Sequence, residues 1–119
     1  MHELAVCQAL IDQVARIAHD RGARQVVSIT VSVGALAGVE PKLLEHAFPL
    51  AAAGGPAEHA ALVVETIPVT VRCRTCRAET GAAPNRLLCG ACQGWQVDVV
   101  SGEQLLLKSI ELEAAAAAV

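Results

Sequence analysis

Aromatic residues are nearly absent from this sequence, whose 119 residues include one Phe, one Trp and no Tyr. Hydrophobic residues nevertheless make up 54% of the chain, and Ala and Val supply much of that share. The core is therefore expected to consist of small aliphatic side chains, with Phe48 and Trp95 as the only large rings. A chain of this length is expected to form one domain, or a small domain that carries a smaller metal-held appendage.

The sequence also lacks the features that would direct it into a membrane or out of the cell. No uninterrupted apolar run is long enough to span a bilayer. The N-terminus has His and Glu where a secretory signal would have Lys or Arg. The net charge of -3 gives no overall reason to expect binding to nucleic acid or anionic lipid. We therefore expect a cytoplasmic protein without a membrane partner.

Four of the five cysteines form two CxxC pairs, Cys73 with Cys76 and Cys89 with Cys92, separated by twelve residues. Each two-residue gap lets one tight turn aim two thiolates at one point, and two such turns complete the tetrahedral sulfur site that Zn²⁺ prefers. The intervening loop is slightly shorter than usual for paired CxxC sites. Two disulfides are disfavoured because no secretory signal is present, and a redox pair would leave the second CxxC unexplained. The pattern predicts a structural zinc site.

Two segments have the period of an amphipathic helix. The first covers residues 4–20 and ends at Gly22. Its apolar stripe comprises Leu4, Cys7, Leu10, Ile11, Val14, Ile17 and Ala18. Because Cys7 lies on this stripe, we interpret it as a small buried hydrophobe rather than a fifth metal ligand. The second helix begins at Pro41 and has its own stripe, formed by Leu43, Leu44, Ala47 and Phe48. Pro49 lacks a backbone donor and should kink or end this helix.

Strands are predicted between and after the helices. Residues 25–33 alternate, with Val27, Ile29, Val31 and Val33 expected on the buried face. Residues 61–71 are rich in Val, Ile and Thr, and Pro68 marks either an edge strand or a boundary between two strands. Residues 96–100 and 104–112 read as two further strands. The predicted fold class is α/β: a small mixed three-stranded sheet with two helices on one face, into which a zinc-ribbon-like domain with four cysteine ligands is inserted. Residues 114–119 are expected to form a frayed tail.

The segments MHELAVCQALID and SGEQLLLKSIELE, together with the doubled CxxC, resemble the HypA/HybF family of nickel-insertion proteins for hydrogenase maturation. The resemblance implies a metallochaperone, not an enzyme, that binds Ni²⁺ near its N-terminus. With a partner GTPase of the HypB type, it would pass the metal to the [NiFe]-hydrogenase large subunit. It also implies a nickel-binding domain of residues 1–68 and 101–119 and a zinc-binding domain of residues 69–100. The segment FPLAAAGGPAEHAAL departs from the family pattern, which more often has an acidic residue at position 49.

The N-terminus has its own metal chemistry. The Met1 amine, the backbone nitrogens of His2 and Glu3 and the His2 imidazole can surround one ion in a plane, which suits Ni²⁺ or Cu²⁺ better than Zn²⁺. Glu3 could add a carboxylate ligand. The residues alone favour a surface histidine and a first-turn acid stabilised by the helix dipole; the resemblance reverses this preference and favours nickel. His46 and His59 are interpreted as solvated or packing residues, although either could complete an octahedral site.

Two other functions compete with metal delivery. A zinc-ribbon module that binds nucleic acid would use the basic residues around the cysteines, with Trp95 stacking on a base. Those residues are Arg72, Arg74, Arg77 and Arg86. They form a small footprint in an otherwise acidic chain, so nucleic-acid binding is not expected. A metalloenzyme is disfavoured because four thiolates leave no open zinc position and no catalytic motif is present. The sequence leaves a homodimer open.

Overall fold

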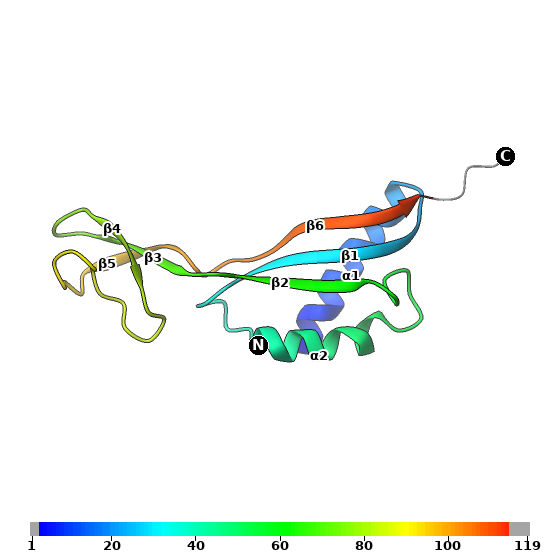
Figure 1. Ribbon diagram of the computed structural model, residues 1–119, viewed down its shortest axis with the longest axis horizontal. Helices are drawn as coiled ribbons and strands as arrows, with labels where there is room; N and C mark the ends of the chain where they lie inside the picture. The colour runs from blue at the N-terminus through cyan, green and yellow to red at the C-terminus, as the bar shows by residue number, and fades with distance from the viewer. Residues whose placement is uncertain (1–2, 115–119) are drawn as a thin grey trace. The chain divides into compact units, whose positions relative to one another are not determined.

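The computed structural model describes residues 3–114, which form two helices and six strands (Figure 1). The elements are α1 (Glu3–Asp20), β1 (Ala23–Gly34), α2 (Pro41–Ala52), β2 (Ala61–Ile67), β3 (Val69–Cys73), β4 (Glu79–Ala82), β5 (Val97–Ser101) and β6 (Leu105–Ala114). The strands form two three-stranded sheets, with the orders β2-β1-β6 and β4-β3-β5. The predicted fold class is therefore confirmed. No helix among these residues is both long and apolar enough to cross a bilayer.

The chain divides into two compact units. The first contains residues 3–31, Val39–Glu65 and residues 107–114, and so holds both helices and most of the first sheet. The second contains Ser32–Gly38 and Thr66–Leu106, and so holds the second sheet and both CxxC pairs. The predicted tail largely lies outside the described residues.

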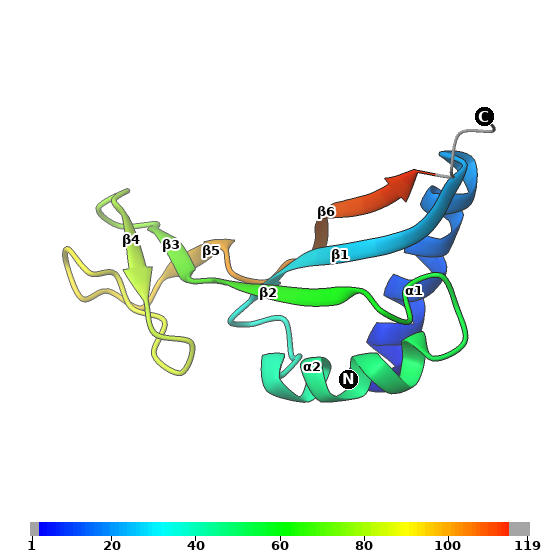
Figure 2. The ribbon, with the colours of Figure 1, turned by 45° about the vertical axis from the view of Figure 1, so that its right-hand side comes forward.

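The first unit is built by packing α1 and α2 on one side of the sheet (Figures 1 and 2). Its fully buried side chains come from both helices and from β1. The largest of them are Cys7, Val14, Val26, Ile29, Val31 and Leu44. Burying one such Leu, Ile or Val side chain stabilises the fold by about 1.5 to 3 kcal/mol. Cys7 lies between the helices, where its Sγ is 3.5 Å from the Leu44 carbonyl oxygen, so its interpretation as a buried small side chain is confirmed.

Several predicted core positions are wrong. Leu4 and Leu43 are 38% and 51% exposed because each lies at the margin of its helix stripe, and Val6 is buried instead of Leu4. Val27 is 45% exposed, whereas Val26 and Ile29 are both buried. The inward-facing phase of β1 therefore changes between these two residues. Strict alternation could not predict this change.

Helix α2 begins at Pro41, as predicted, and continues past Pro49 to Ala52. Of the two effects expected of Pro49, a kink or an end, the end of the helix does not occur there. Proline removes the hydrogen bond to the carbonyl four residues earlier, and its ring crowds that carbonyl, which here belongs to Glu45. Both residues are exposed, so water can satisfy that carbonyl. The helix ends instead before Gly54, which has a φ of +80°.

In the second unit β3 is the central strand, antiparallel to both β4 and β5. Val69, Val71 and Cys73 are buried, while Thr70 and Arg72 alternate with them. Pro68 separates β2 from β3, so the two-strand interpretation of residues 61–71 is confirmed. Strand β4 lies within the loop between the CxxC pairs and has no counterpart in the prediction.

Candidate metal centre

The first CxxC pair folds into a tight turn at the end of β3. The backbone N–H groups of Thr75 and Cys76 donate to the Cys73 Sγ at 3.3 and 3.4 Å, and the Arg77 N–H donates to the Cys73 carbonyl at 3.0 Å. Arg77 has a φ of +63°, a left-handed conformation that costs a non-glycine residue about 1 to 2 kcal/mol. The turn thus directs two backbone dipoles towards one sulfur.

The second CxxC pair repeats this geometry. The N–H groups of Ala91 and Cys92 donate to the Cys89 Sγ at 3.3 and 3.4 Å. The Gln93 N–H donates to the Cys89 carbonyl at 2.9 Å, and Gln93 has a φ of +65°. Two copies of one local turn therefore present two sulfurs each. This repetition follows from the CxxC spacing and is the part of the site that sequence predicts most directly.

The two turns bring all four sulfurs within 4.8 Å of one another. Cys73 Sγ is 3.6 Å from Cys92 Sγ, and Cys76 Sγ is 3.5 Å from Cys89 Sγ. With Zn–S bonds of about 2.3 Å, a tetrahedral site separates its sulfurs by about 3.8 Å. A disulfide would need about 2.0 Å, and all these cysteines are free. The donor set and its spacing therefore fit a four-coordinate zinc ion.

The ionisation of the four thiols also points to a cation. Backbone N–H bonds, first that of Cys76, lower the pKa of Cys73 to about 6, and those of Cys92 and Ala91 lower the pKa of Cys89. The Gly94 N–H lowers the pKa of Cys92, but the neighbouring sulfurs outweigh it and raise that pKa to about 12. Four thiolates in contact repel one another, so a bound divalent ion is needed to hold all of them deprotonated.

Two residues that sequence reasoning missed, Thr80 and Gly94, shape the second turn. Gly90 donates its N–H to the Thr80 Oγ1 of β4 at 2.8 Å, which attaches the turn to the sheet. A Cβ at Gly94 would lie 3.2 Å from Cys92 Sγ and 3.8 Å from Cys73 Sγ. A larger residue at position 94 would therefore crowd the sulfurs. The sequence could have indicated this close approach, because Gly94 lies two residues after the last cysteine. Nothing in the sequence indicates the role of Thr80.

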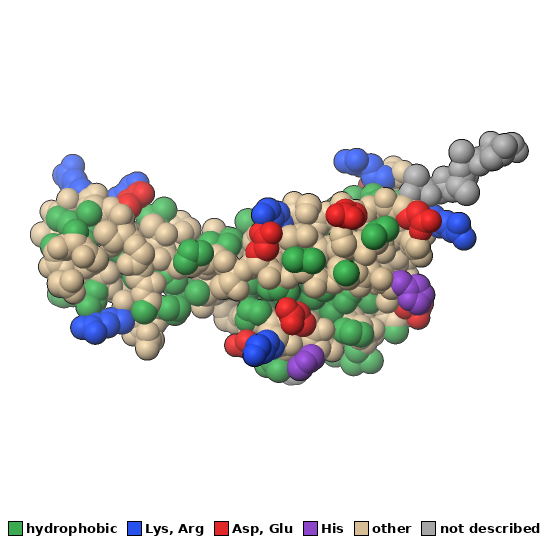
Figure 3. Space-filling view, viewed as in Figure 1, with side chains coloured by type: hydrophobic (Ala, Val, Ile, Leu, Met, Phe, Trp, Pro, Cys, Tyr) green, Lys and Arg blue, Asp and Glu red, His purple; other side chains and the backbone are tan. Residues whose placement is uncertain are grey.

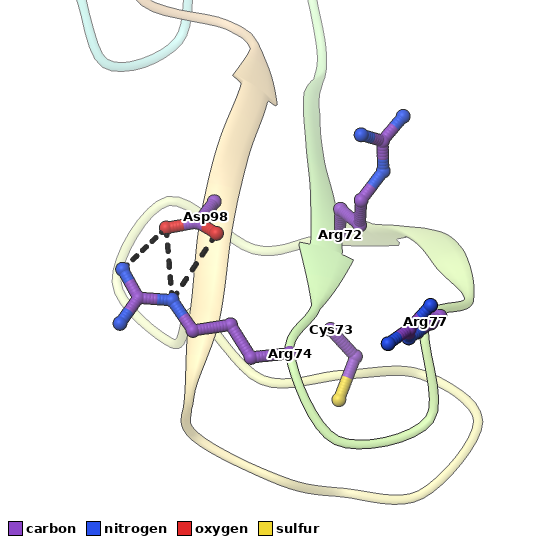
Figure 4. A pocket seen from close by; sticks show the side chains of 5 residues that line it. All are labelled: Arg72, Cys73, Arg74, Arg77 and Asp98. Carbon is purple, nitrogen blue, oxygen red and sulfur yellow. Dashed lines mark hydrogen bonds and ion pairs between the residues drawn. The ribbon is translucent and has the colours of Figure 1, made fainter.

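The arginines near the cysteines are partly neutralised. Arg74 binds the Asp98 carboxylate through its Nε and Nη2, at 3.1 and 2.6 Å (Figure 4), and Arg72 pairs with Glu79 on β4. On the face shown in Figure 3 the basic side chains are scattered and do not form one continuous patch. Trp95 is 74% exposed, so the expectation that it belongs to the core is wrong. This arrangement gives little support to the nucleic-acid alternative.

The predicted nickel residues are only partly described. Met1 and His2 lie outside the described residues. Glu3 is the first residue of α1, and its Oε1 accepts a hydrogen bond of 3.5 Å from the backbone N–H of Glu40. His46 and His59 are exposed. Within residues 3–113, the four-cysteine cluster is the only group of three or more metal-binding side chains.

Fold and site together define a small α/β protein that carries a structural-type four-sulfur metal centre. The family described as hydrogenase/urease nickel incorporation, metallochaperone, HypA matches residues 1–112. The chain belongs to this family. It is a family of nickel metallochaperones for hydrogenase maturation, which confirms the expected non-enzymatic role.

Similar proteins share nearly the whole chain. The hydrogenase maturation factor HypA of Nitrosospira multiformis is 46% identical over 112 residues, which cover 94% of this chain and 97% of that protein. The protein of the same name from Aquifex aeolicus is 36% identical, with coverages of 95% and 98%. The solution structure of the Ni metallochaperone HypA from Helicobacter pylori has the same fold, with a TM-score of 0.70 at 23% identity and coverages of 97% and 100%.

Proposed function

We propose that this chain binds Ni²⁺ through His2 and Glu3, with the Met1 amine and nearby backbone nitrogens, and delivers it to the large subunit of [NiFe]-hydrogenase. The observation that carries the proposal is that the family match begins at residue 1 and so includes this motif. Planar nitrogen coordination suits Ni²⁺. A site at the chain end is also easy to open, as transfer of the metal requires.

The position of Glu3 supports this role. Its carboxylate lies at the start of α2, where it accepts the N–H of Glu40 at 3.5 Å. This distance is long for a hydrogen bond, so little free energy is lost when the carboxylate turns to a metal ion. The contact keeps Glu3, the first residue of α1, beside α2. Its carboxylate can still exchange this weak hydrogen bond for a bond to a metal ion.

In this proposal the two metals have separate tasks. Zn²⁺ at Cys73, Cys76, Cys89 and Cys92 is permanent and structural, because four thiolates leave no position for exchange of cargo. The zinc-binding domain comprises residues 69–100. The nickel-binding domain comprises residues 1–68 and 101–119. Delivery takes place in the cytoplasm with a GTPase of the HypB type as partner.

The test is a calorimetric titration with Ni²⁺ of the zinc-loaded wild type and of the zinc-loaded His2→Ala variant. Metal analysis then gives the nickel and zinc content of each protein. The variant should lose specific nickel binding and keep its zinc and its fold. Mass spectrometry must first show that Met1 is retained, because its amine is one of the ligands. His46→Ala and His59→Ala test whether either of these exposed histidines completes the nickel site. Unchanged nickel affinity in His2→Ala would refute the proposal.

A further inference from the structure

A hollow of about 490 Å³ lies beside the first CxxC turn, within the second unit. It is lined by Arg72 and Cys73 of β3, Arg74 and Arg77 of the turn, and Asp98 of β5 (Figure 4). Neither the zinc site nor the nickel motif explains a hollow with three guanidinium groups. We therefore considered a separate binding function for the residues that line this hollow.

The strand register explains how these charges gather. Arg72 is paired directly with Asp98 across β3 and β5 and with Glu79 across β3 and β4, and directly paired residues project to the same face of a sheet. Arg74 reaches back from the turn to the Asp98 carboxylate. The polar face of this sheet thus already holds two guanidinium–carboxylate pairs.

These pairs are held weakly. The side chains of Arg74 and Asp98 are 66% and 57% exposed, and those of Arg72 and Glu79 are 60% and 45% exposed. Exposed ion pairs contribute little because water and salt screen them, so an incoming carboxylate can replace either partner at low cost. Arg77 has no side-chain partner among the described residues, so its guanidinium is the one on this lining that no carboxylate of that part of the chain already binds.

Arg77 also occupies a position that glycine would fill with less strain. Its φ of +63° follows from the CxxC turn, since Gln93 has the same conformation in the other turn. The hydrogen bond from the Arg77 N–H to the Cys73 carbonyl helps to hold this strained conformation. Here the strained residue places an unpaired guanidinium on the lining of the hollow (Figure 4).

We propose that this hollow is a docking site for an acidic segment of a partner protein, whose carboxylates bind Arg77 and displace Asp98 from Arg74. The fork of a guanidinium matches the two oxygens of a carboxylate, and both partners that the site already holds are carboxylates. The hollow is lined by only three guanidinium groups, too few to follow a run of phosphates, which disfavours nucleic acid. The proposal concerns the zinc-bearing unit alone and does not depend on nickel binding.

The test uses the full-length zinc-loaded protein and an acetylated hexaglutamate peptide as the probe. Binding is followed by NMR through the backbone amides and the arginine Nε–H signals, at low and high salt. Arg77→Gly should weaken binding about threefold to fivefold, as expected for the loss of an exposed charge pair of up to about 1 kcal/mol. Gln93→Gly relieves the same backbone strain in the other turn and should leave the affinity unchanged. Asp98→Asn frees Arg74 and should tighten binding about threefold or more, as an exposed charge pair of under 1 kcal/mol allows.

Three outcomes would overturn the proposal. Arg24→Gln removes an exposed charge from the first unit, and an equal loss of affinity in this variant would show that the attraction is only diffuse. Equally tight, arginine-dependent binding of hexathymidylate would assign the hollow to nucleic acid. If Arg77→Gly loses zinc, the arginine serves the anionic metal centre, and Asp98→Asn then decides: unchanged or weaker binding in that variant refutes docking.

Discussion

Gly34 and Gly102 approach each other so closely that a Cβ on Gly34 would lie 2.2 Å from the Gly102 carbonyl oxygen. The contact is fixed by backbone hydrogen bonds: Gly34 N–H donates to the Gln104 carbonyl and Leu36 N–H to the Gly102 carbonyl, each at 2.7 Å. On its other side, a Cβ on Gly102 would meet the Val69 Cα at 2.9 Å. Three chain segments of the second unit therefore pass one another with no room for a side chain.

Replacing Gly34 by alanine should lower the free energy of unfolding by about 3 kcal/mol or more, at the upper end of overpacking effects. The reason is that the new methyl group would meet backbone atoms held by two short hydrogen bonds, so neither strand can move aside alone. Urea denaturation followed by circular dichroism measures the change.

The control is Gly38→Ala. Gly38 has a φ of +75°, and nothing lies within 4 Å of the Cβ position, so this substitution should cost only about 1 kcal/mol of left-handed strain. Equal losses in the two variants would mean that strain, and not the close approach of Gly34 to Gly102, decides the stability.

The sequence predicted features of this fold that depend on neighbouring residues. The CxxC spacing specifies both sulfur-bearing turns because each is a local hydrogen-bonded structure. The 3.6-residue period placed Cys7 on the buried stripe of α1, and Pro41 marked the start of α2. Of the two interpretations of Pro68, the boundary between two strands is correct, because proline cannot donate to a continuous ladder.

Features that depend on distant partners were missed. Strand β4 has the sequence ETGA, which has little strand propensity, and it forms only because Val71 and Arg72 of β3 pair with Thr80 and Glu79. The contact between Gly34 and Gly102 joins residues far apart in the chain, so no local pattern announces it. The exposure of Val27 likewise reflects a phase change that alternation alone cannot show.

The left-handed residues of the two CxxC turns give a second prediction. At Arg77, glycine should be more stabilising than alanine by about 0.5 to 1 kcal/mol, because alanine carries the left-handed penalty and glycine only a larger unfolded-state entropy. The same order should hold at Gln93. The measurement is thermal unfolding of zinc-loaded Gly and Ala variants at each position.

Thr75 supplies the matched comparison for this prediction. It lies in the same turn with no positive φ, so there the alanine variant should be the more stable one. If alanine is equal to or better than glycine at both Arg77 and Gln93, the left-handed conformation is not maintained in solution.

Removal of zinc should unfold the region of residues 69–100. Only Val69, Val71, Cys73 and Cys89 are buried there, and burial of so few small side chains cannot offset the entropy of ordering this segment. Chelation, Cys73→Ala or Cys92→Ala should collapse the NMR dispersion of β3, β4 and β5. The α1 and α2 signals should persist, since their core contains no metal ligand. Native β3 shifts in a zinc-free sample would contradict this expectation.

Cys7 should behave as an inert thiol until the first unit unfolds. Burial, and to a smaller degree the charge of Glu3, raises the pKa of Cys7, and only the thiolate reacts with disulfide reagents. Treatment with dithionitrobenzoate after chelation should therefore modify four cysteines rapidly and the fifth only in denaturant. Cys7→Ala should keep full zinc content and lose about 1 kcal/mol of stability, the value of one buried methylene-sized group. Rapid modification of all five cysteines after chelation alone, or loss of zinc in Cys7→Ala, would show that Cys7 is coupled to the metal centre and is not an independent part of the helix interface.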